Sequence, residues 1–545
     1  MAAASYAHGV SDVPLLGETI GENLRRTVAR AGDSEALIAR HQHYRATYRE
    51  FWEQTGLAAR GLMARGIQPG DRVGIWAPNR FEWVIIQYAT ARMGAILVNI
   101  NPAYKSTELE YALKQSGVSL LMLARRYRTT NYVAMVEEVR GQLPDLAQTL
   151  VLDDEWDALL EAGKHVSPDA LAEHEAQLQF DDPINSQYTS GTTGFPKGAT
   201  LSHHNILNNG FFIGELLGYS ERDRVCIPVP FYHCFGMVLG NLACTTHGSC
   251  MVIPDEGYDP VTVLETVQAE RCTALYGVPT MFIGELDHPR FNEFDLATLR
   301  TGIMAGSPCP IEVMKKVQST MHMTEVAICY GMTETSPVST QSAVDDPLDK
   351  RVETVGRVHP HLEVKIIDAE GRIVPRGTPG ELCTRGYSVM LGYWNNPAAT
   401  SEAIDAARWM HTGDLATMDD GGYVNIVGRI KDMIIRGGEN VYPREIEEFL
   451  YRHPDISDVQ VIGVPSERYG EEVMAWVRLR EGATTSDADL TEYCRSRIAT
   501  FKIPRYWKFV DAFPMTVTGK IQKFKMRADA IEELGLHSAA QSRTA

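Results

Sequence analysis

Short apolar segments alternate with longer helix-like ones over the first 180 residues, and this alternation constrains the fold more than any other feature of the sequence. Residues 72–78 (RVGIWAP), 95–101 (AILVNIN) and 119–124 (SLLMLA) have the length and composition of buried strands. Residues 81–94 and 107–117, which lie between them, read as helices. Strands and helices that alternate in this way form crossover units with parallel strands. We therefore expect an α/β domain built on a mainly parallel sheet.

The pattern changes twice further along the chain. Residues 354–394 are rich in strand and turn signals, and GRIKD at residues 428–432 precedes a compact mixture of helices and strands of about 110 residues, the usual size of a domain. A chain of 545 residues is also too long for one compact core. We expect a large domain over residues 1–428, a boundary at 429–432 and a small α+β domain over 433–545.

Composition excludes several classes of protein. The formal net charge of −18 argues against broad binding to nucleic acid or to an anionic membrane, so an anionic ligand must meet a local positive site. Nine cysteines without CxxC pairs favour reduced thiols in a cytoplasmic setting, and the N-terminus shows no basic region followed by an apolar run. Residues 225–254 carry no charged side chain, but prolines, His233 and Asn241 interrupt them, which favours a buried strand and helix over a membrane span.

The segment YTSGTTGFPKGA, residues 188–199, has the composition of a phosphate-binding loop. Its glycines permit close backbone approach, its hydroxyl groups are donors and Lys197 is a cation. It is not a Walker loop, because Pro196 precedes the lysine and Gly198 follows it. The alternative is a flexible surface loop, which suits most segments rich in glycine and serine.

The same segment resembles the phosphate loop of the adenylate-forming superfamily, which contains acyl-CoA synthetases, peptide-synthetase adenylation domains and firefly-type luciferases. Further segments that resemble the motifs of this family follow in order: TGIMAGSP (301–308), ICYGMTETSP (328–337), HTGD (411–414), GRIKD and TGKIQK (518–523). The resemblance covers residues from roughly 40 to 527. It implies a large N-terminal domain of parallel α/β sheets with a β-barrel subdomain, followed by a small α+β lid.

The resemblance assigns roles in binding ATP. Tyr330 is expected to stack on adenine, Thr333 to donate to the α-phosphate and Glu334 to hold Mg²⁺. Asp414 is expected to bind the ribose hydroxyls and Arg429 the ribose or a phosphate. Taken alone, Glu334 reads as a helix-start residue and Asp414 as a turn residue. The remaining assignments are phosphate contacts by Thr189, Ser190, Gly191, Thr192, Thr193, Gly194 and Lys197, and contacts near adenine by Gly306, Ser307, Pro308 and Gly331.

Two lysines are assigned to catalysis and to domain movement. Lys520 in TGKIQK is expected to bridge the attacking carboxylate and the α-phosphate, whereas the neighbouring basic residues have the alternative reading of a solvated face. Lys431 matches the hinge position of the family. Rotation of the small domain about this hinge would withdraw Lys520 and present the CoA-side residues Gly437, Gly438 and Glu439.

The segment PFYHCFGM, residues 230–237, bears on the acid substrate. An isolated histidine among aromatic residues is usually a packed core residue, but the resemblance places His233 at the carboxylate end of the acyl site, as a catalytic or gating residue. Amino-acid-activating relatives tend to carry an Asp in this region, and this segment has no carboxylate. The resemblance therefore implies an acid without an amino group.

Together these features predict an ATP-dependent fatty acid–CoA ligase that resembles the medium-chain branch, with ATP, Mg²⁺ and CoA as cofactor or cosubstrates. A medium- to long-chain acid is favoured, and the continuous sequence after GRIKD favours CoA over a carrier protein as acceptor. The alternatives are a ligase for an aryl or other bulky acid, a P-loop NTPase or kinase, and a non-catalytic nucleotide-binding scaffold. We expect no nucleic-acid partner, no transmembrane segment and a cytoplasmic location, and the sequence leaves a homodimer open.

Overall fold

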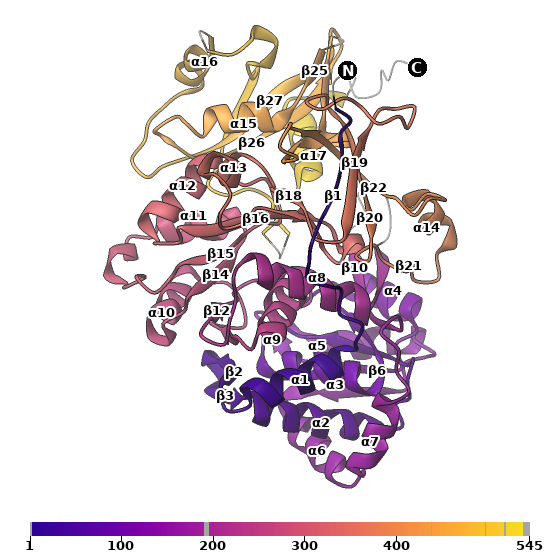
Figure 1. Cartoon of the computed structure of the whole chain (residues 1–545). Helices are drawn as coiled ribbons and strands as arrows, with labels where there is room; N and C mark the ends of the chain where they lie inside the picture. The colour runs from indigo at the N-terminus through magenta and orange to yellow at the C-terminus, as the bar shows by residue number, and fades with distance from the viewer. Residues whose placement is uncertain (1–2, 190–195, 438, 496, 517–518, 538–545) are drawn as a thin grey trace.

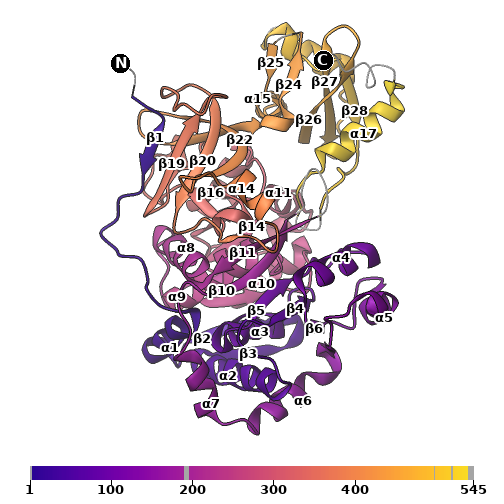
Figure 2. The same ribbon diagram turned by 90° about the vertical axis from the view of Figure 1, so that its right-hand side faces the viewer.

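The structure of the chain is a computed structural model, and it describes residues 3–189, 196–437, 439–495, 497–516 and 519–537. Over these residues the chain forms two large, mainly parallel sheets, an antiparallel sheet beside them and a smaller sheet near the C-terminus (Figure 1). A view turned by 90° shows the C-terminal unit standing apart from the large sheets (Figure 2). This architecture confirms the predicted α/β fold with a C-terminal α+β unit.

The first parallel sheet contains the strands predicted within the first 180 residues. Its strands, in sheet order, are β21 (Gly392–Tyr393), β11 (Lys197–Ser202), β10 (Pro183–Thr189), β5 (Ile96–Asn99), β4 (Arg72–Trp76), β6 (Leu120–Leu123) and β9 (Gln148–Val151). The strands from β10 to β9 run parallel, whereas β11 and β21 are antiparallel additions. Its helices are α2 (Tyr48–Ala64), α3 (Phe81–Met93), α4 (Ser106–Ser116), α5 (Tyr132–Val139), α6 (Leu152–Lys164) and α7 (Pro168–Glu175), and a short hairpin joins β7 (Arg126–Tyr127) to β8 (Thr130–Asn131).

The second parallel sheet combines the start of the chain with its middle. Its strands, in sheet order, are β18 (Arg357–Val358), β17 (Val338–Gln341), β16 (Glu325–Gly331), β15 (Thr301–Met304), β14 (Ala274–Gly277), β12 (Arg224–Cys226), β13 (Cys250–Ile253), β2 (Glu35–Ala39) and β3 (Tyr44–Thr47). The strands from β16 to β2 are parallel. Its helices are α1 (Ile20–Ala31), α8 (His203–Leu216), α9 (Ala243–His247), α10 (Pro260–Glu270), α11 (Pro279–Leu286), α12 (Ile311–Thr320) and α13 (Leu348–Glu353).

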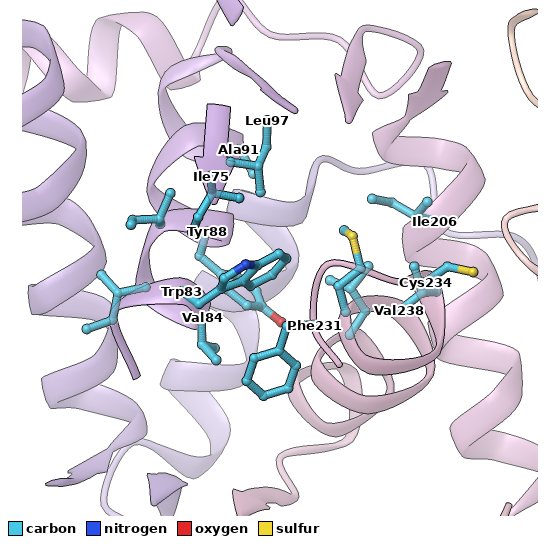
Figure 3. Packing of buried hydrophobic residues seen from close by; sticks show 14 of the residues in the cluster. Ile75, Trp83, Val84, Tyr88, Ala91, Leu97, Ile206, Phe231, Cys234 and Val238 are labelled. Atoms are coloured by element: carbon cyan, nitrogen blue, oxygen red, sulfur yellow. The ribbon is translucent and has the colours of Figure 1, made fainter. Parts of the chain in front are cut away.

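Helix α3 joins the hydrophobic cores of the two parallel sheets. Its residues from Glu82 to Met93 are all buried, which is why this segment shows no polar face in the sequence. Trp83 packs on Phe231 with ring centroids 5.6 Å apart, and Tyr88 Oη donates to the backbone oxygen of Asn241 at 3.1 Å. Figure 3 shows α3 side chains lying between those of the first sheet and those around Val238.

The uncharged stretch over residues 225–254 is part of this core. It contains β12, a π-helix (Phe235–Leu242), α9 and β13, and most of its residues are buried. The predicted buried strand and helix are therefore confirmed. In the ranges that the structure describes, no helix is both long enough and apolar enough to cross a membrane. All nine cysteines lie in these ranges as buried free thiols.

The strand-rich region becomes the antiparallel sheet, and the last part of the chain forms a separate sheet. The antiparallel sheet has the order β1 (Tyr6–His8), β19 (Leu362–Ile367), β20 (Gly380–Gly386), β22 (Met410–Met418) and β23 (Val424–Arg429), with α14 (Pro397–Ala403) beside it. After a 3₁₀ turn (Ile430–Asp432) come β24 (Ile434–Arg436), β25 (Glu439–Val441), α15 (Pro443–Leu450), β26 (Ile456–Ser466), β27 (Gly470–Leu479), α16 (Asp487–Arg495), β28 (Tyr506–Phe509) and α17 (Lys523–Glu533).

The C-terminal unit is held against the large part by polar contacts. Glu448 of α15 accepts a hydrogen bond from the backbone nitrogen of Ile311, at the start of α12, at 3.3 Å. Asp287, at the end of α11, accepts from Arg480 Nη1 at 3.1 Å and from Ser457 Oγ at 3.2 Å. These contacts fix the position from which the C-terminal unit reaches the large part.

Candidate active site

Lys520 lies on a tight turn that inserts into the large part. The backbone nitrogen of Gly519 donates to Thr516 O at 2.9 Å, and Thr516 N donates to Lys520 O at 2.8 Å, which closes the turn. Gly519 has a φ of +76°, and a Cβ at this position would lie 2.7 Å from Val278 Cγ2. Gly306 contacts the same valine, because its Cβ would lie 3.1 Å from Val278 Cγ1. Val278 therefore separates the lysine turn from the segment expected to pack on adenine.

The charged groups expected to handle ATP act electrostatically on Lys520. Burial lowers the pKa of the partly buried Lys520 ammonium, Arg429 adds to this, and the carboxylates of Glu334 and Asp414 oppose it. Burial, together with the charge of Lys520, lowers the pKa of His233 to about 3. The charges of these predicted site residues, which come from five separate segments, therefore act on one another.

Asp414 is fixed by two donors from different strands. Tyr330 Oη donates to Asp414 Oδ2 at 2.6 Å, and Arg429, its cross-strand partner on β23, lies with Nε 3.2 Å from Oδ1. Burial raises the pKa of Asp414, and Arg429 opposes the rise. Each carboxylate oxygen has a second lone pair, so Asp414 keeps acceptor capacity for hydroxyl groups such as those of a ribose.

Glu334 lies in a 3₁₀ turn (Thr333–Thr335) and is 5% exposed. Its Oε1 accepts from Tyr393 Oη at 2.8 Å, and the Nζ of Lys197 lies 5.0 Å from the centre of the Tyr393 ring. Thr333 is buried, with Oγ1 3.8 Å from Cys234 Sγ. Tyr393 therefore links the predicted metal ligand to the lysine of the phosphate loop.

His233 is a neutral residue in this site. Its Nδ1 accepts from the backbone nitrogen of Phe235 at 3.1 Å, so Nε2 carries the proton of the neutral ring. With a pKa of about 3 it is uncharged at neutral pH. His233 can therefore donate a hydrogen bond from Nε2 to a bound carboxylate, but it cannot serve there as a cation.

The remaining predicted residues fall into three groups. Thr189 and Lys197 are cross-strand partners that hold the ends of the phosphate loop together, whereas Ser190, Gly191, Thr192, Thr193 and Gly194 lie outside the described residues, as does Gly438. Gly331 is required sterically, since a Cβ there would lie 1.7 Å from Pro337 O. Gly306, Ser307 and Pro308 lie in the segment between β15 and α12.

The predicted CoA-side residues lie at the start of β25 and just before it. Gly437 donates from its backbone nitrogen to Tyr469 O at 2.8 Å, and Glu439 begins β25 and is exposed. Both views place β25 at the outer end of the C-terminal unit, away from the two parallel sheets (Figures 1 and 2). Lys431 lies in the exposed 3₁₀ turn between β23 and β24.

Sequence reasoning missed several residues that organise the site. Val278, Tyr393 and Asp287 belong to none of the quoted motifs, and each acts through a partner far away in the chain. Lys523, which was open to the reading of a solvated lysine, instead pairs with the buried Glu447 at 2.6 Å. The signal available in the sequence was Gly519, next to the lysine predicted to be catalytic, because a glycine permits close approach.

Comparison with known proteins gives the family. Residues 24–394 match the AMP-binding enzyme family, and residues 445–520 match the AMP-binding enzyme C-terminal domain. The chain is 50% identical to the putative acyl-CoA synthetase YngI of Bacillus subtilis, over 96% of this chain and 99% of that protein. It is 44% identical to the mitochondrial medium-chain acyl-CoA ligase ACSF2 of Danio rerio, over 98% and 91% of the two chains.

Solved structures agree with this result. The anthranilate CoA ligase AuaEII in complex with anthranoyl-AMP superposes with a TM-score of 0.85 and 27% identity, covering 96% of this chain and 99% of that chain. ATP-bound MatB from Rhodopseudomonas palustris superposes with a TM-score of 0.82 and 29% identity, over 94% and 99% of the two chains. The chain thus belongs to the AMP-binding enzyme family and is an AMP-forming acyl-CoA ligase.

Proposed function

We propose that this ligase activates a medium- to long-chain fatty acid. The carboxylate attacks the α-phosphorus of ATP, a C–O–P bond forms and pyrophosphate leaves. The CoA thiol then attacks the acyl carbon, and AMP leaves as the thioester forms. The observation that supports the chain length is the 44% identity to the mitochondrial medium-chain acyl-CoA ligase ACSF2 of Danio rerio. The first step is supported by Lys520, whose charge is affected by Glu334 and Asp414 and itself affects His233.

The first step brings two anions together, so the site must supply positive charge and orientation. Lys520 would contact both the attacking carboxylate and the α-phosphate, and its partial burial strengthens those contacts because less water screens them. Thr333 would donate to the α-phosphate, and His233 Nε2 would orient the acid. Asp414, Tyr330 and Arg429 would hold the nucleoside, and the loop from Thr189 to Lys197 would hold the departing pyrophosphate.

The carboxylate of Glu334 is suited to hold Mg²⁺. It is buried and hydrogen-bonded through one oxygen to Tyr393, which fixes its orientation and leaves the other oxygen for a cation. When bound, Mg²⁺ would neutralise charge on the phosphates. Tyr393 would then position the ligand, and Lys197 would contribute a second cation from the loop.

The second step requires a different arrangement of the C-terminal unit. Lys520 would have to leave for the residues around Gly437–Asn440 to reach the acyl-adenylate, and the 3₁₀ turn with Lys431 is the segment we assign as the pivot. The domain limits at residues 428 and 433 follow from this assignment. The change between the two arrangements of the C-terminal unit would be a hinge movement.

A second candidate substrate is an aryl or other bulky acid. The observation that favours it is the likeness to an anthranilate CoA ligase, at 27% identity. A panel of straight-chain acids of increasing length and of aryl acids, measured by ATP-dependent AMP release with CoA present, separates the two. A kcat/KM maximum among the straight-chain acids of medium or greater length supports the proposal, and a maximum at an aryl acid contradicts it.

A further inference from the structure

Three side chains that commonly ligate metals meet in the antiparallel sheet, outside the groups assigned to ATP, the acid and CoA. Glu381 and Cys383 lie two residues apart on β20, and His411 on β22 is the cross-strand partner of Cys383. One ligand atom of each lies within 4.8 Å of the others. Residues two apart on a strand project from the same face of the sheet, so β20 directs both side chains towards His411.

The distances between these atoms are close to those within a zinc site. His411 Nδ1 lies 3.1 Å from Glu381 Oε2 and 3.7 Å from Cys383 Sγ. In a tetrahedral Zn²⁺ site with bonds of about 2.0–2.2 Å to nitrogen or oxygen and about 2.3 Å to sulfur, neighbouring ligand atoms lie roughly 3.3–3.6 Å apart. Small side-chain shifts would therefore bring all three atoms to bonding distance of one ion.

Other groups orient two of the ligands. Glu381 Oε1 accepts from the backbone nitrogen of Gly413 at 3.1 Å, which leaves Oε2 towards His411. Asp405 Oδ1 accepts from the backbone nitrogens of Ala407 and Trp409, and its Oδ2 lies 3.7 Å from His411 Nε2. A carboxylate at the far nitrogen of a ligating histidine is the usual outer contact of a zinc site, since it holds the proton there and directs the other nitrogen to the metal.

We propose that Glu381, Cys383 and His411 form a Zn²⁺ site, with Asp405 as its outer positioning residue and water in the fourth position. A mixed set of sulfur, nitrogen and oxygen ligands suits Zn²⁺, whereas Mg²⁺ and Ca²⁺ prefer oxygen alone. The thiolate and the Glu381 carboxylate would balance the two positive charges. The side chains of Glu381 and His411 are 23% and 31% exposed, which gives the ion a path from solvent.

Binding has to displace a proton. The thiolate is the form that ligates a metal, so Cys383 releases its proton to solvent when the Zn–S bond forms. Lys365, opposite Cys383 on β19, is held with its Nζ 4.5 Å from the centre of the Trp409 ring. The ammonium group of Lys365 is therefore held by the Trp409 ring.

The position of the site suggests what the ion would do. His411 and Asp414 both lie on β22, three residues apart. Gly413, which lies between them, donates its backbone N–H to Glu381. A bound ion would cross-link β20 to β22 directly beside the carboxylate assigned to the ribose. We expect it to stabilise this end of the sheet and to take no part in either chemical step.

Co²⁺ titration of the full-length protein, freed of metal with a chelator, tests the site. Bound Co²⁺ should give a thiolate-to-cobalt charge-transfer band and intense d–d bands at one equivalent, and Zn²⁺ should displace both. Cys383→Ser should abolish the charge-transfer band, and His411→Gln should remove most of the binding. Asp405→Asn should weaken binding by about 10- to 100-fold while keeping the band, as expected of an outer residue.

Cys494→Ser is the matched control, because Cys494 is also a buried free thiol but lies in the C-terminal unit. It should leave the titration unchanged. Thermal unfolding with and without Zn²⁺ provides a second measurement, in which Zn²⁺ should raise the Tm of the wild type and not that of Cys383→Ser. A wild-type protein without a charge-transfer band, or a band that persists in Cys383→Ser, would overturn the proposal.

Discussion

At the scale of single residues, the proposed chemistry depends on Lys520, whose charged form is disfavoured by its surroundings. Burial lowers the pKa of Lys520, and the approach of Arg429 adds to the cost of its charge. The neighbouring carboxylates Glu334 and Asp414 offset part of this cost. Two phosphate or carboxylate anions arriving at the site would offset more, so the environment of Lys520 favours the charged lysine most when substrates are bound.

Lys520→Ala should therefore remove adenylate formation selectively. We expect a loss of about 10²–10³-fold in the rate of acyl-AMP formation, the usual effect of removing one group that stabilises a transition state. Pyrophosphate exchange measures this half-reaction, and release of AMP from supplied acyl-AMP and CoA measures the other, which should stay within about twofold of wild type. Lys525→Ala, an exposed lysine on α17, serves as control. Equal losses in both half-reactions would contradict the separate roles of the two arrangements.

Gly519 tests how closely the lysine turn must approach the large part. Gly519→Ala places a Cβ 2.7 Å from Val278 Cγ2 and forces a side chain into a φ of +76°. Strain of about 1–3 kcal/mol at such a position corresponds to roughly 5- to 150-fold in the population of the docked turn. Adenylate formation should fall within that range, and thioester formation from acyl-AMP should be unchanged.

The double variant Gly519→Ala with Val278→Ala separates contact from backbone strain. Removing the valine methyl groups relieves the contact but leaves the φ unchanged, so adenylate formation should recover in part. A double variant no faster than Gly519→Ala would mean that Val278 does not limit the approach of the turn.

At the scale of secondary structure, both ends of α11 contact the C-terminal unit. Val278 precedes its first residue and contacts the lysine turn, whereas Asp287 follows its last residue and contacts Ser457 and Arg480 of the C-terminal unit. Between them, Glu285 is 1% exposed, and its Oε2 has no hydrogen-bond partner among the described residues. The helix that positions the C-terminal unit therefore carries a buried carboxyl group whose Oε2 lacks a partner among the described residues.

Glu285→Gln should make stability less dependent on pH. Burial raises the pKa of Glu285 well above its ordinary value of 4.5, so the folded protein retains a proton that the unfolded chain releases. Its contribution is complete below pH about 4.5 and is lost as pH rises towards the folded-state pKa, at up to about 1.4 kcal/mol per pH unit. Urea unfolding across this range should show a smaller loss of unfolding free energy in the variant.

The exposed Glu137→Gln on α5 reports the effect of removing a surface charge. If Glu285→Gln and wild type lose stability in parallel as the pH rises, the carboxyl is ionised in the folded protein and this account of α11 is wrong.

The sequence predicts elements better than it predicts their contacts. Helix starts depend on neighbours within three residues: Thr47 and Glu50 form the capping box of α2, Ser202 caps α8 and Pro443 begins α15. The polarity pattern of α3 gave only a generic helix, since a helix buried on every side has no polar face to indicate its partners. Tyr393 could not be found, because β21 meets β11 only after the chain has folded.

At the scale of the whole molecule, polar contacts from Asp287 and Glu448 join the two units beside the packing of the Gly519 turn on Val278. Asp287 and Arg480 are separated by 193 residues, so no local pattern could have announced their pairing. Both side chains remain more than a third exposed, and the pair is correspondingly weak. A weak polar contact at this junction suits the movement of the C-terminal unit that we propose.

Asp287→Ala should therefore shift the balance between the two half-reactions. Losing the contacts to Arg480 and Ser457 costs the docked arrangement about 0.5–1 kcal/mol, or roughly two- to fivefold in population. The ratio of adenylate formation to thioester formation should fall by that factor, and added salt should lower the wild-type ratio in the same direction while changing the variant less. Glu293→Ala, which breaks the Arg290–Glu293 pair within the large part, is the matched control and should leave the ratio unchanged. A ratio that stays at the wild-type value in Asp287→Ala would show that this junction does not govern the movement, and that the turn around Lys520 alone holds the C-terminal unit in place.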